Sequence, residues 1–161
     1  MIVRDMTAGE LDVVGALRVA AYSVDGLLDA SPEYVEELRG LGGDGHGQVL
    51  VAVGSGDAVV GTLMLEDFGA HSEVAREAGE IEIRGFAVDP AMRGRGVGRA
   101  LLAEAEQRAA VRGHRMVLST LPAMTAARSL YLAQGYEREP DRDWEPLPGL
   151  QLLAYGKDLP G

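Results

Sequence analysis

The amino-acid sequence predicts a mixed α/β protein with a mostly antiparallel central sheet and helices on both of its faces. Short runs rich in β-formers alternate with stretches in which apolar residues recur at helical spacing, in the order β-α-α-β-β-β-α-β-α-β-β. The chain has 161 residues, of which 47% are hydrophobic and 25% charged. That length and composition are ordinary for one globular domain, which we expect to span residues 1–161.

The individual elements follow from local patterns. In chain order we expect a strand over 2–5, helices over about 8–22 and Pro32–Leu41, strands over Gln48–Val53, Ala58–Leu65 and Glu80–Val88, a helix over Val97–Arg112, a strand over Arg115–Ser119, a helix over Pro122–Gln134 and a last strand over Gln151–Lys157. Thr7 and Glu10 form a capping box for the first helix, and Ser31-Pro32 opens the second. Gly54-Ser55-Gly56-Asp57 predicts a hairpin, and Gly135 ends the last helix.

Three segments lack a regular pattern. Five of the eight residues from Gly40 to Gly47 are glycine, which predicts a loop that is either a linker or a substrate lid. Residues 67–79 read as irregular or weakly helical surface. Residues 137–145 hold five acids against two arginines, as a solvated loop does; beside a pocket they would favour a cationic amine. Trp144 either lines an acceptor site or anchors this loop.

Composition excludes several classes of function. A net charge of −10 argues against DNA or RNA, whose phosphates require an excess of lysine and arginine. The absence of cysteine excludes a disulfide scaffold, a thiolate metal site and a cysteine nucleophile. The three histidines do not stand at metal-ligand spacing, so we expect no metal. No apolar run approaches a length of about 18 residues and the chain begins without an apolar signal, so we expect a cytoplasmic protein with no membrane partner.

The most informative segment is a strand followed by a glycine turn and a helix. Gly94, Gly96 and Gly98 lie within residues 80–115, a segment that contains seven arginines and five acidic residues. This excess of positive charge indicates either an anion-binding site or an exposed arginine-rich helix face. Glycine lets the backbone approach a ligand, and the first amides of a helix lack intrahelical acceptors, so the turn suits a phosphate. It lacks the lysine of a nucleoside-triphosphate loop. It also lacks the third glycine and the ribose-binding acid of a dinucleotide site.

The turn resembles a known family motif. Arg93-Gly94-Arg95-Gly96-Val97-Gly98 is similar to the Arg/Gln-x-x-Gly-x-Gly/Ala motif of the Gcn5-related N-acetyltransferase (GNAT) superfamily, which holds the pyrophosphate of acetyl-coenzyme A. Residues 82–90 resemble the family's fourth strand, and residues 126–136 resemble its later helix. The resemblance implies acetyl-CoA as the acyl donor, bound by Phe86, Ala87, Val88, Arg93, Gly94, Arg95, Gly96, Val97, Gly98 and Arg99. Met124 departs from the family's frequent cofactor-contacting Asn, and Tyr136 replaces the usual Phe.

Two residues are candidates for catalysis. Tyr131 matches the position of the family's frequent general acid, which protonates the leaving thiolate; alternatively, it packs its helix against the sheet. Glu82 is the candidate general base, acting through water; alternatively, it is a structural partner of Arg84 or another arginine. Gly85 interrupts the same strand, either as a bulge that opens the cofactor cleft or as relief of a packing clash. Without cysteine, we expect direct transfer in a ternary complex.

We therefore expect an N-acetyltransferase that moves an acetyl group from acetyl-CoA directly to an amine acceptor. The leading acceptor is a small-molecule primary amine or amino acid derivative, and a protein or peptide amine is the second. A non-catalytic module that senses acyl-CoA is the alternative from another class, although the retained Glu82 and Tyr131 favour an enzyme. Edge strands near the C-terminus are expected to allow a homodimer.

Overall fold

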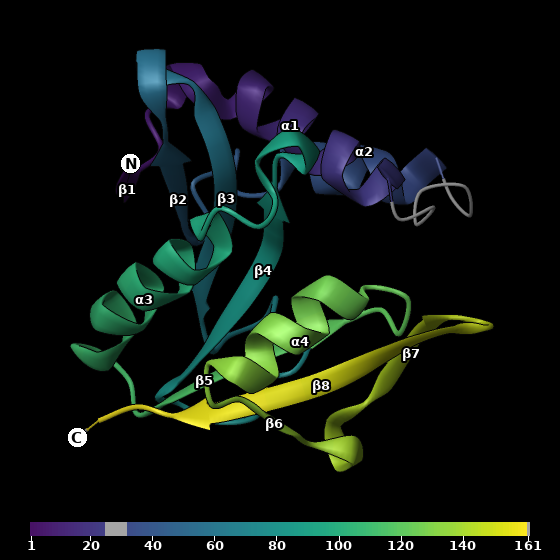
Figure 1. Ribbon diagram of the computed structural model, residues 1–161. Helices are drawn as coiled ribbons and strands as arrows, with labels where there is room; N and C mark the ends of the chain where they lie inside the picture. Colours follow the sequence, from purple (N-terminus) through teal and green to yellow (C-terminus); the bar gives the residue numbers. More distant parts are fainter. Residues whose placement is uncertain (25–31, 161) are drawn as a thin grey trace. The chain divides into compact units, whose positions relative to one another are not determined.

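The computed structural model describes residues 1–24 and 32–160, so Ser31 lies outside the described residues. Its helices and strands are β1 (Ile2–Asp5), α1 (Leu11–Val24), α2 (Pro32–Gly40), β2 (Gln48–Val53), β3 (Val59–Asp67), β4 (Glu80–Val88), α3 (Val97–Ala110), β5 (Arg115–Thr120), α4 (Thr125–Ala133), β6 (Glu137–Arg138), β7 (Trp144–Leu147) and β8 (Leu150–Asp158) (Figure 1). The chain forms two compact units, Met1–Leu65 with Gly85–Ala105 and Glu66–Arg84 with Glu106–Gly161. Strand β4 begins in the second unit and ends in the first.

In the first unit, helices cover both faces of the sheet. β1 pairs with β2, and β2 with β3, both antiparallel. Val14 of α1 packs in a cluster with Val51 and Met64 on one face. A Cβ added to Gly61 of β3 would lie 2.7 Å from Val97 and 2.8 Å from Leu101, both in α3. Because residues 61 and 64 point to opposite faces of the strand, α1 and α3 lie on opposite faces of this sheet.

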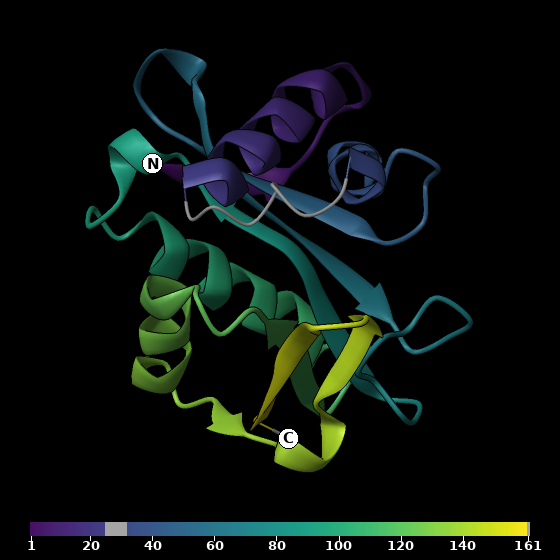
Figure 2. The ribbon, with the colours of Figure 1, turned by 90° about the vertical axis from the view of Figure 1, so that its right-hand side faces the viewer.

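In the second unit, the strand order is β4-β5-β8-β6, and β7 pairs with β8 on a separate ladder. Only β4 and β5 are parallel among the strand pairs described in this unit, as expected for a mostly antiparallel sheet. Helix α4 lies along β8 (Figure 1), and the hairpin of β7 and β8 is yellow in Figure 2. Val74 packs with Val117 and Ala154 on the face opposite the one that Tyr155 of β8 shares with α4.

The observed boundaries differ from the expected ones at several ends. The capping box is confirmed, because the Thr7 amide donates to Glu10 Oε1 at 2.9 Å, but a 3₁₀ turn precedes α1. Helix α4 begins at Thr125 instead of Pro122, because the Met124 amide donates to the Leu121 carbonyl in a turn before it. Strand β7 was expected to be loop; it contains Pro146, which a strand tolerates where its missing N–H is not needed.

No helix in residues 1–24 or 32–160 combines the length and apolar character needed to cross a membrane. The homodimer, the cytoplasmic location and the single domain remain predictions.

Candidate active site

The glycine turn lies in the first unit, between the end of β4 and the start of α3. Asp89 closes the strand: its amide donates to the Val60 carbonyl at 2.8 Å, and its Oδ1 accepts from the Ala91 amide at 2.9 Å. A 3₁₀ turn over Pro90–Met92 follows. Gly94 and Gly96 have φ of +78° and +81°, the left-handed region that only glycine adopts without strain.

Open space surrounds the backbone of this turn. Among residues 1–24 and 32–160, no heavy atom lies within 4 Å of the position that a Cβ would take on Gly94 or Gly96. The first bond of α3 runs from the Ala100 amide to the Gly96 carbonyl, so the preceding amides stand at the positive end of the helix dipole. The turn therefore presents exposed backbone at the positive end of a helix, which is a suitable place for an anion.

The ten residues expected to bind the cofactor fall into two groups by exposure. Buried or half-buried are Phe86, Ala87, Val88, Val97 and Gly98; exposed are Arg93, Gly94, Arg95, Gly96 and Arg99. The guanidinium of Arg93 lies 3.4 Å from the Ala21 carbonyl in the last turns of α1. Their cofactor-binding roles remain predictions.

Tyr131 lies in the second unit, on α4, in a cluster of three buried tyrosines. Its ring centroid is 5.8 Å from that of Tyr136 and 5.9 Å from that of Tyr155. The residue is 3% exposed. Burial, with a smaller contribution from Tyr155, raises the pKa of Tyr131 far above its usual value, so its hydroxyl holds its proton at neutral pH. The hydroxyl therefore carries a proton, and its raised pKa makes it a weaker acid than a solvated tyrosine.

Tyr136, which stands where the resembled family usually has phenylalanine, forms a hydrogen bond with its hydroxyl. It donates to Glu106 Oε2 at 3.0 Å, while Lys157 Nζ donates to Glu106 Oε1 at 2.6 Å and lies 5.5 Å from the Tyr136 ring centroid. Lys157 is the one lysine in the sequence. The extra hydroxyl thus ties the end of α4 to α3 within this unit.

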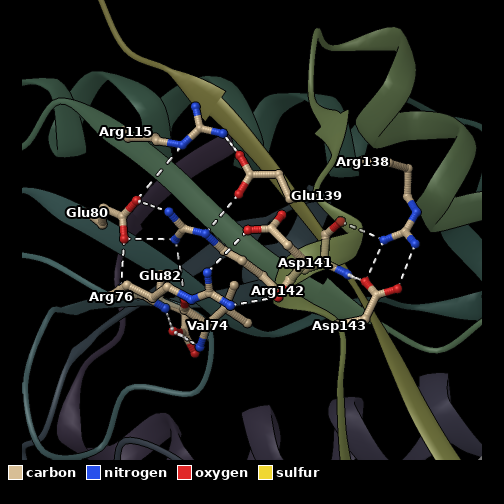
Figure 3. A network of polar contacts seen from close by, with 12 residues as sticks. Val74, Arg76, Glu80, Glu82, Arg115, Arg138, Glu139, Asp141, Arg142 and Asp143 are labelled. Carbon is tan, nitrogen blue, oxygen red and sulfur yellow. Dashed lines mark hydrogen bonds and ion pairs between the residues drawn. The ribbon is translucent and has the colours of Figure 1, made fainter.

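Glu82 is 1% exposed and binds backbone amides (Figure 3). Its carboxylate accepts from the amides of Val74 at 2.8 Å, Ala75 at 2.9 Å and Glu73 at 3.1 and 3.2 Å. The three amides lower its pKa, but burial outweighs them and the pKa of Glu82 is raised. The role of Glu82 as a base remains a prediction, and the structure gives the same carboxylate a second role in fixing residues 73–75.

The arginine expected as the structural partner of Glu82 has other acceptors. Arg84 pairs with Glu66 at 3.3 Å and with Glu73 at 3.2 Å. The charge of Glu82 also contributes to the raised pKa of Arg84, so the arginine alternative stands beside the amide contacts of residues 73–75.

Residues 137–145 do not form the solvated acidic loop that the sequence suggested. Three of their acids pair with arginines, as Figure 3 shows: Asp143 with Arg138 at 2.7 Å, Asp141 with Arg76 at 3.2 Å, and Glu139 with Arg115 and Arg142. Arg76 and Arg115 come from distant segments, whereas Arg138 and Arg142 lie in the same stretch. Arg142 also binds both oxygens of the buried Glu80 at 2.8 Å. Within this network the acids are largely neutralised, so they carry little attraction for a cationic amine.

Trp144 anchors the start of β7. Its Nε1 donates to Ser119 Oγ at 3.2 Å, and its ring packs against the cluster that includes Val117 and Ala154. Of the two alternatives for Trp144, the contacts favour the anchor.

The start of α4 carries the departure from the family's asparagine. The Met124 sulfur accepts from the Thr120 hydroxyl at 3.3 Å, and no side-chain hydrogen bond from Met124 caps the helix. Sequence reasoning missed Arg128, whose guanidinium reaches Tyr155 Oη at 3.0 Å. No local pattern reveals this pair, because its members are 27 residues apart.

Potential metal sites are also relevant to the chemistry. Among the residues that the structure describes, no group of three or more His, Asp or Glu side chains is arranged to hold a metal ion.

Comparisons with known proteins converge on one family. The family model described as the acetyltransferase (GNAT) family matches residues 17–136. No curated protein matches the sequence. Three similar solved structures are a GNAT-family acetyltransferase from Staphylococcus aureus Mu50 (14% identity, 99% of each chain, TM-score 0.77), the PaiA N-acetyltransferase from Thermoplasma acidophilum in complex with coenzyme A (16%, 98% of each, 0.73) and a ribosomal-protein-alanine N-acetyltransferase from Brucella melitensis (23%, 99% of this chain and 100% of that one, 0.69). At these identities the structures show a shared fold.

Proposed function

Because this chain belongs to the acetyltransferase (GNAT) family, a family of acyl-CoA-dependent N-acetyltransferases, we propose that it moves the acetyl group of acetyl-CoA to the primary amine of a small molecule. The observation that carries this proposal is the glycine turn. Gly94 and Gly96 hold left-handed backbone with open space where side chains would stand, directly before α3. These residues fit a pyrophosphate, and Arg95 and Arg99 supply exposed positive charge beside it.

The proposed chemistry is a direct transfer. Bound acetyl-CoA supplies a thioester whose carbonyl carbon accepts the amine: a C–N bond forms, the C–S bond breaks, the amine loses a proton and the thiolate gains one. We assign the proton donation to Tyr131, whose position matches the family's general acid and whose hydroxyl is protonated at neutral pH. Glu82 is assigned to proton removal through water, and the backbone amide near Val88 to polarising the carbonyl.

The proposed acceptor is a neutral or cationic amine. A net charge of −10 attracts cations and repels anionic acceptors over distances of about a Debye length. The acids of residues 137–145 add little to this preference, because arginines neutralise most of them.

A thiol-release assay tests the proposal. Acetyl-CoA is mixed with the protein and with a panel of alkyl monoamines, diamines, polyamines, amino acid amides and peptides with a free α-amine, and released coenzyme A is titrated. We expect turnover with at least one small amine and little with peptides. Turnover with peptides alone would mean that the acceptor is a protein or peptide amine and not a small molecule. Calorimetric binding of acetyl-CoA without any thiol release would identify a sensing module instead.

A further inference from the structure

Two tyrosine rings flank Tyr131 at nearly equal distances, but their hydroxyls bind different helices: that of Tyr155 binds α4, which carries Tyr131, and that of Tyr136 binds α3. The ring of Tyr155 lies 5.9 Å away at an interplanar angle of 49°, and its hydroxyl accepts from Arg128 Nε of α4 at 3.0 Å. The ring of Tyr136 lies 5.8 Å away at 58°, and its hydroxyl donates to Glu106 of α3. The two neighbours are therefore alike in packing and different in their polar connection.

Arg128 connects three parts of the second unit. It precedes Tyr131 by three residues, which places both side chains on one face of α4. Besides Tyr155, its guanidinium binds the Pro122 carbonyl at 3.0 Å, in the loop between β5 and α4. One cation thus fixes the beginning of α4 to the preceding loop and to β8.

Tyr155 is held from a second side as well. It is fully buried, and the guanidinium of Arg138 lies 5.5 Å from its ring centroid. Arg138 is itself fixed by the Ala154 carbonyl at 2.8 Å and by Asp143 at 2.7 Å. A ring with a bonded hydroxyl, a cation on its face and no exposure has little freedom to rotate.

We infer that Arg128 and Tyr155 are positioning residues that orient the Tyr131 hydroxyl for proton donation. The inference rests on the proposed role of Tyr131. Displacing a reacting group by about 1 Å can cost about 10²-fold in rate, so a fixed neighbour of the donor ring has a measurable effect.

The first test uses four single variants with acetyl-CoA and the panel amine that releases thiol fastest. We expect Tyr155→Phe to lower kcat roughly 10- to 100-fold, with the KM for acetyl-CoA changed less than about twofold. Arg128→Gln should do the same, and Arg128→Lys should recover part of the loss because lysine restores one donor. Tyr136→Phe is the matched control and should keep wild-type kcat, since it removes a hydroxyl from the equally close ring that is not bonded to α4.

The second test is a double-mutant cycle with Tyr131→Phe. If Tyr155 acts through the Tyr131 hydroxyl, then Tyr155→Phe should lower kcat little further once that hydroxyl is gone. Additive losses would mean that Tyr155 acts only through general packing and would overturn the inference. Thermal melts of each variant verify that it is folded.

The outcomes separate this inference from the proposed function. Wild-type kcat in Tyr155→Phe beside a large loss in Tyr131→Phe overturns the positioning role alone. Wild-type kcat in Tyr131→Phe overturns both the donor assignment and the positioning role, while acetyl transfer itself stands. Absence of thiol release by the wild-type protein with every amine overturns the proposed function.

Discussion

Gly85 of β4 lies against the buried guanidinium of Arg18 in α1. A Cβ on Gly85 would stand 3.2 Å from Arg18 Nε and 3.0 Å from Leu41 Cδ2, and the residue has a φ of +61°. Arg18 in turn donates to the carbonyls of Leu38 at 3.2 Å and Leu41 at 2.7 Å. These contacts support the packing explanation for this glycine, and the φ of +61° beside a β4–β5 register that runs from Glu80 to Ile83 fits the bulge explanation.

Gly85→Ala should therefore destabilise the protein through both strain and contact. We expect a loss of about 2–3 kcal/mol in the free energy of unfolding, measured by urea denaturation. Gly56→Ala is the matched control: its φ is +70°, but no heavy atom lies within 4 Å of the added Cβ, so it should lose only about 1 kcal/mol. Equal losses at the two positions would show that contact with Arg18 and Leu41 contributes nothing.

Gly96→Glu should abolish binding of coenzyme A. The new side chain places volume and negative charge where we propose the pyrophosphate, and its left-handed φ adds strain. Gly56→Glu carries the same charge and a similar strain in the turn between β2 and β3. Isothermal calorimetry should therefore find coenzyme A affinity lost in the first variant and kept in the second. If folded Gly96→Glu binds coenzyme A with unchanged affinity, the cofactor does not bind at this turn.

Tyr131→Phe should lower kcat by roughly 10²–10⁴-fold, the usual span for one lost proton donor. The ring and its contacts with Tyr136 and Tyr155 remain, so packing changes little. Coenzyme A affinity should fall by at most about 0.5–1.5 kcal/mol, the value of one neutral hydrogen bond. Steady-state kinetics beside a coenzyme A titration measures both. Near-wild-type turnover would leave Tyr131 as a packing residue.

Glu82→Gln should lower activity most at low pH, where the acceptor amine is mostly protonated and a base is most needed. Raising the pH supplies free amine and should shrink the deficit. Activity is measured across pH with saturating acetyl-CoA, and melting temperature is recorded in parallel. Because Glu82 also binds the amides of residues 73–75, a deficit that stays flat with pH and accompanies a lower melting temperature would assign it a structural role alone.

Glu10 should make stability depend on pH in acid. Its bidentate pair with Arg4, at 2.8 Å for each bond, and the Thr7 amide hold the pKa of Glu10 at about 2, below the ordinary 4.5. A lowered folded-state pKa stabilises the fold above pH 4.5, and this stabilisation is lost as the pH falls toward 2. Because the pair is partly exposed, we expect it to contribute about 0.5–1 kcal/mol to the free energy of unfolding.

The comparison of wild type with Glu10→Gln measures this contribution. Urea unfolding at pH 7 should show the variant to be less stable, and the difference should narrow at about pH 3. A difference that is equal at both pH values would exclude the Arg4 pair as its source.

Local patterns predicted the elements well where local physics decides them. The Thr7–Glu10 capping box, the apolar spacing of α1 and the glycine turn before α3 act within a few residues of chain, so the sequence displays them directly. Helix α4 was predicted three residues too long at its start, because a turn between Leu121 and Met124 precedes it. The candidate site was predicted as a motif, and its residues occur in the expected elements.

Long-range pairing could not be read in the same way. The acids of residues 137–145 looked solvated because two of their arginine partners, Arg76 and Arg115, lie far away in the chain. Glu82 was expected to pair with an arginine, and its carboxylate also accepts hydrogen bonds from main-chain amides, which no sequence motif reveals. Charge and composition specify how many ionic groups exist, while the fold decides which of them meet.

The Lys157–Glu106 contact has a practical consequence for an enzyme that acetylates amines. Lys157 is the sole side-chain amine in the 161 residues, and arginine supplies the remaining 14 basic side chains, whose guanidinium groups remain charged and so are poor acyl acceptors. Self-acetylation on a lysine side chain can therefore occur only at Lys157. The Nζ of this residue donates to Glu106 Oε1 at 2.6 Å. Reagents selective for lysine would attach a label or a tether at this one position.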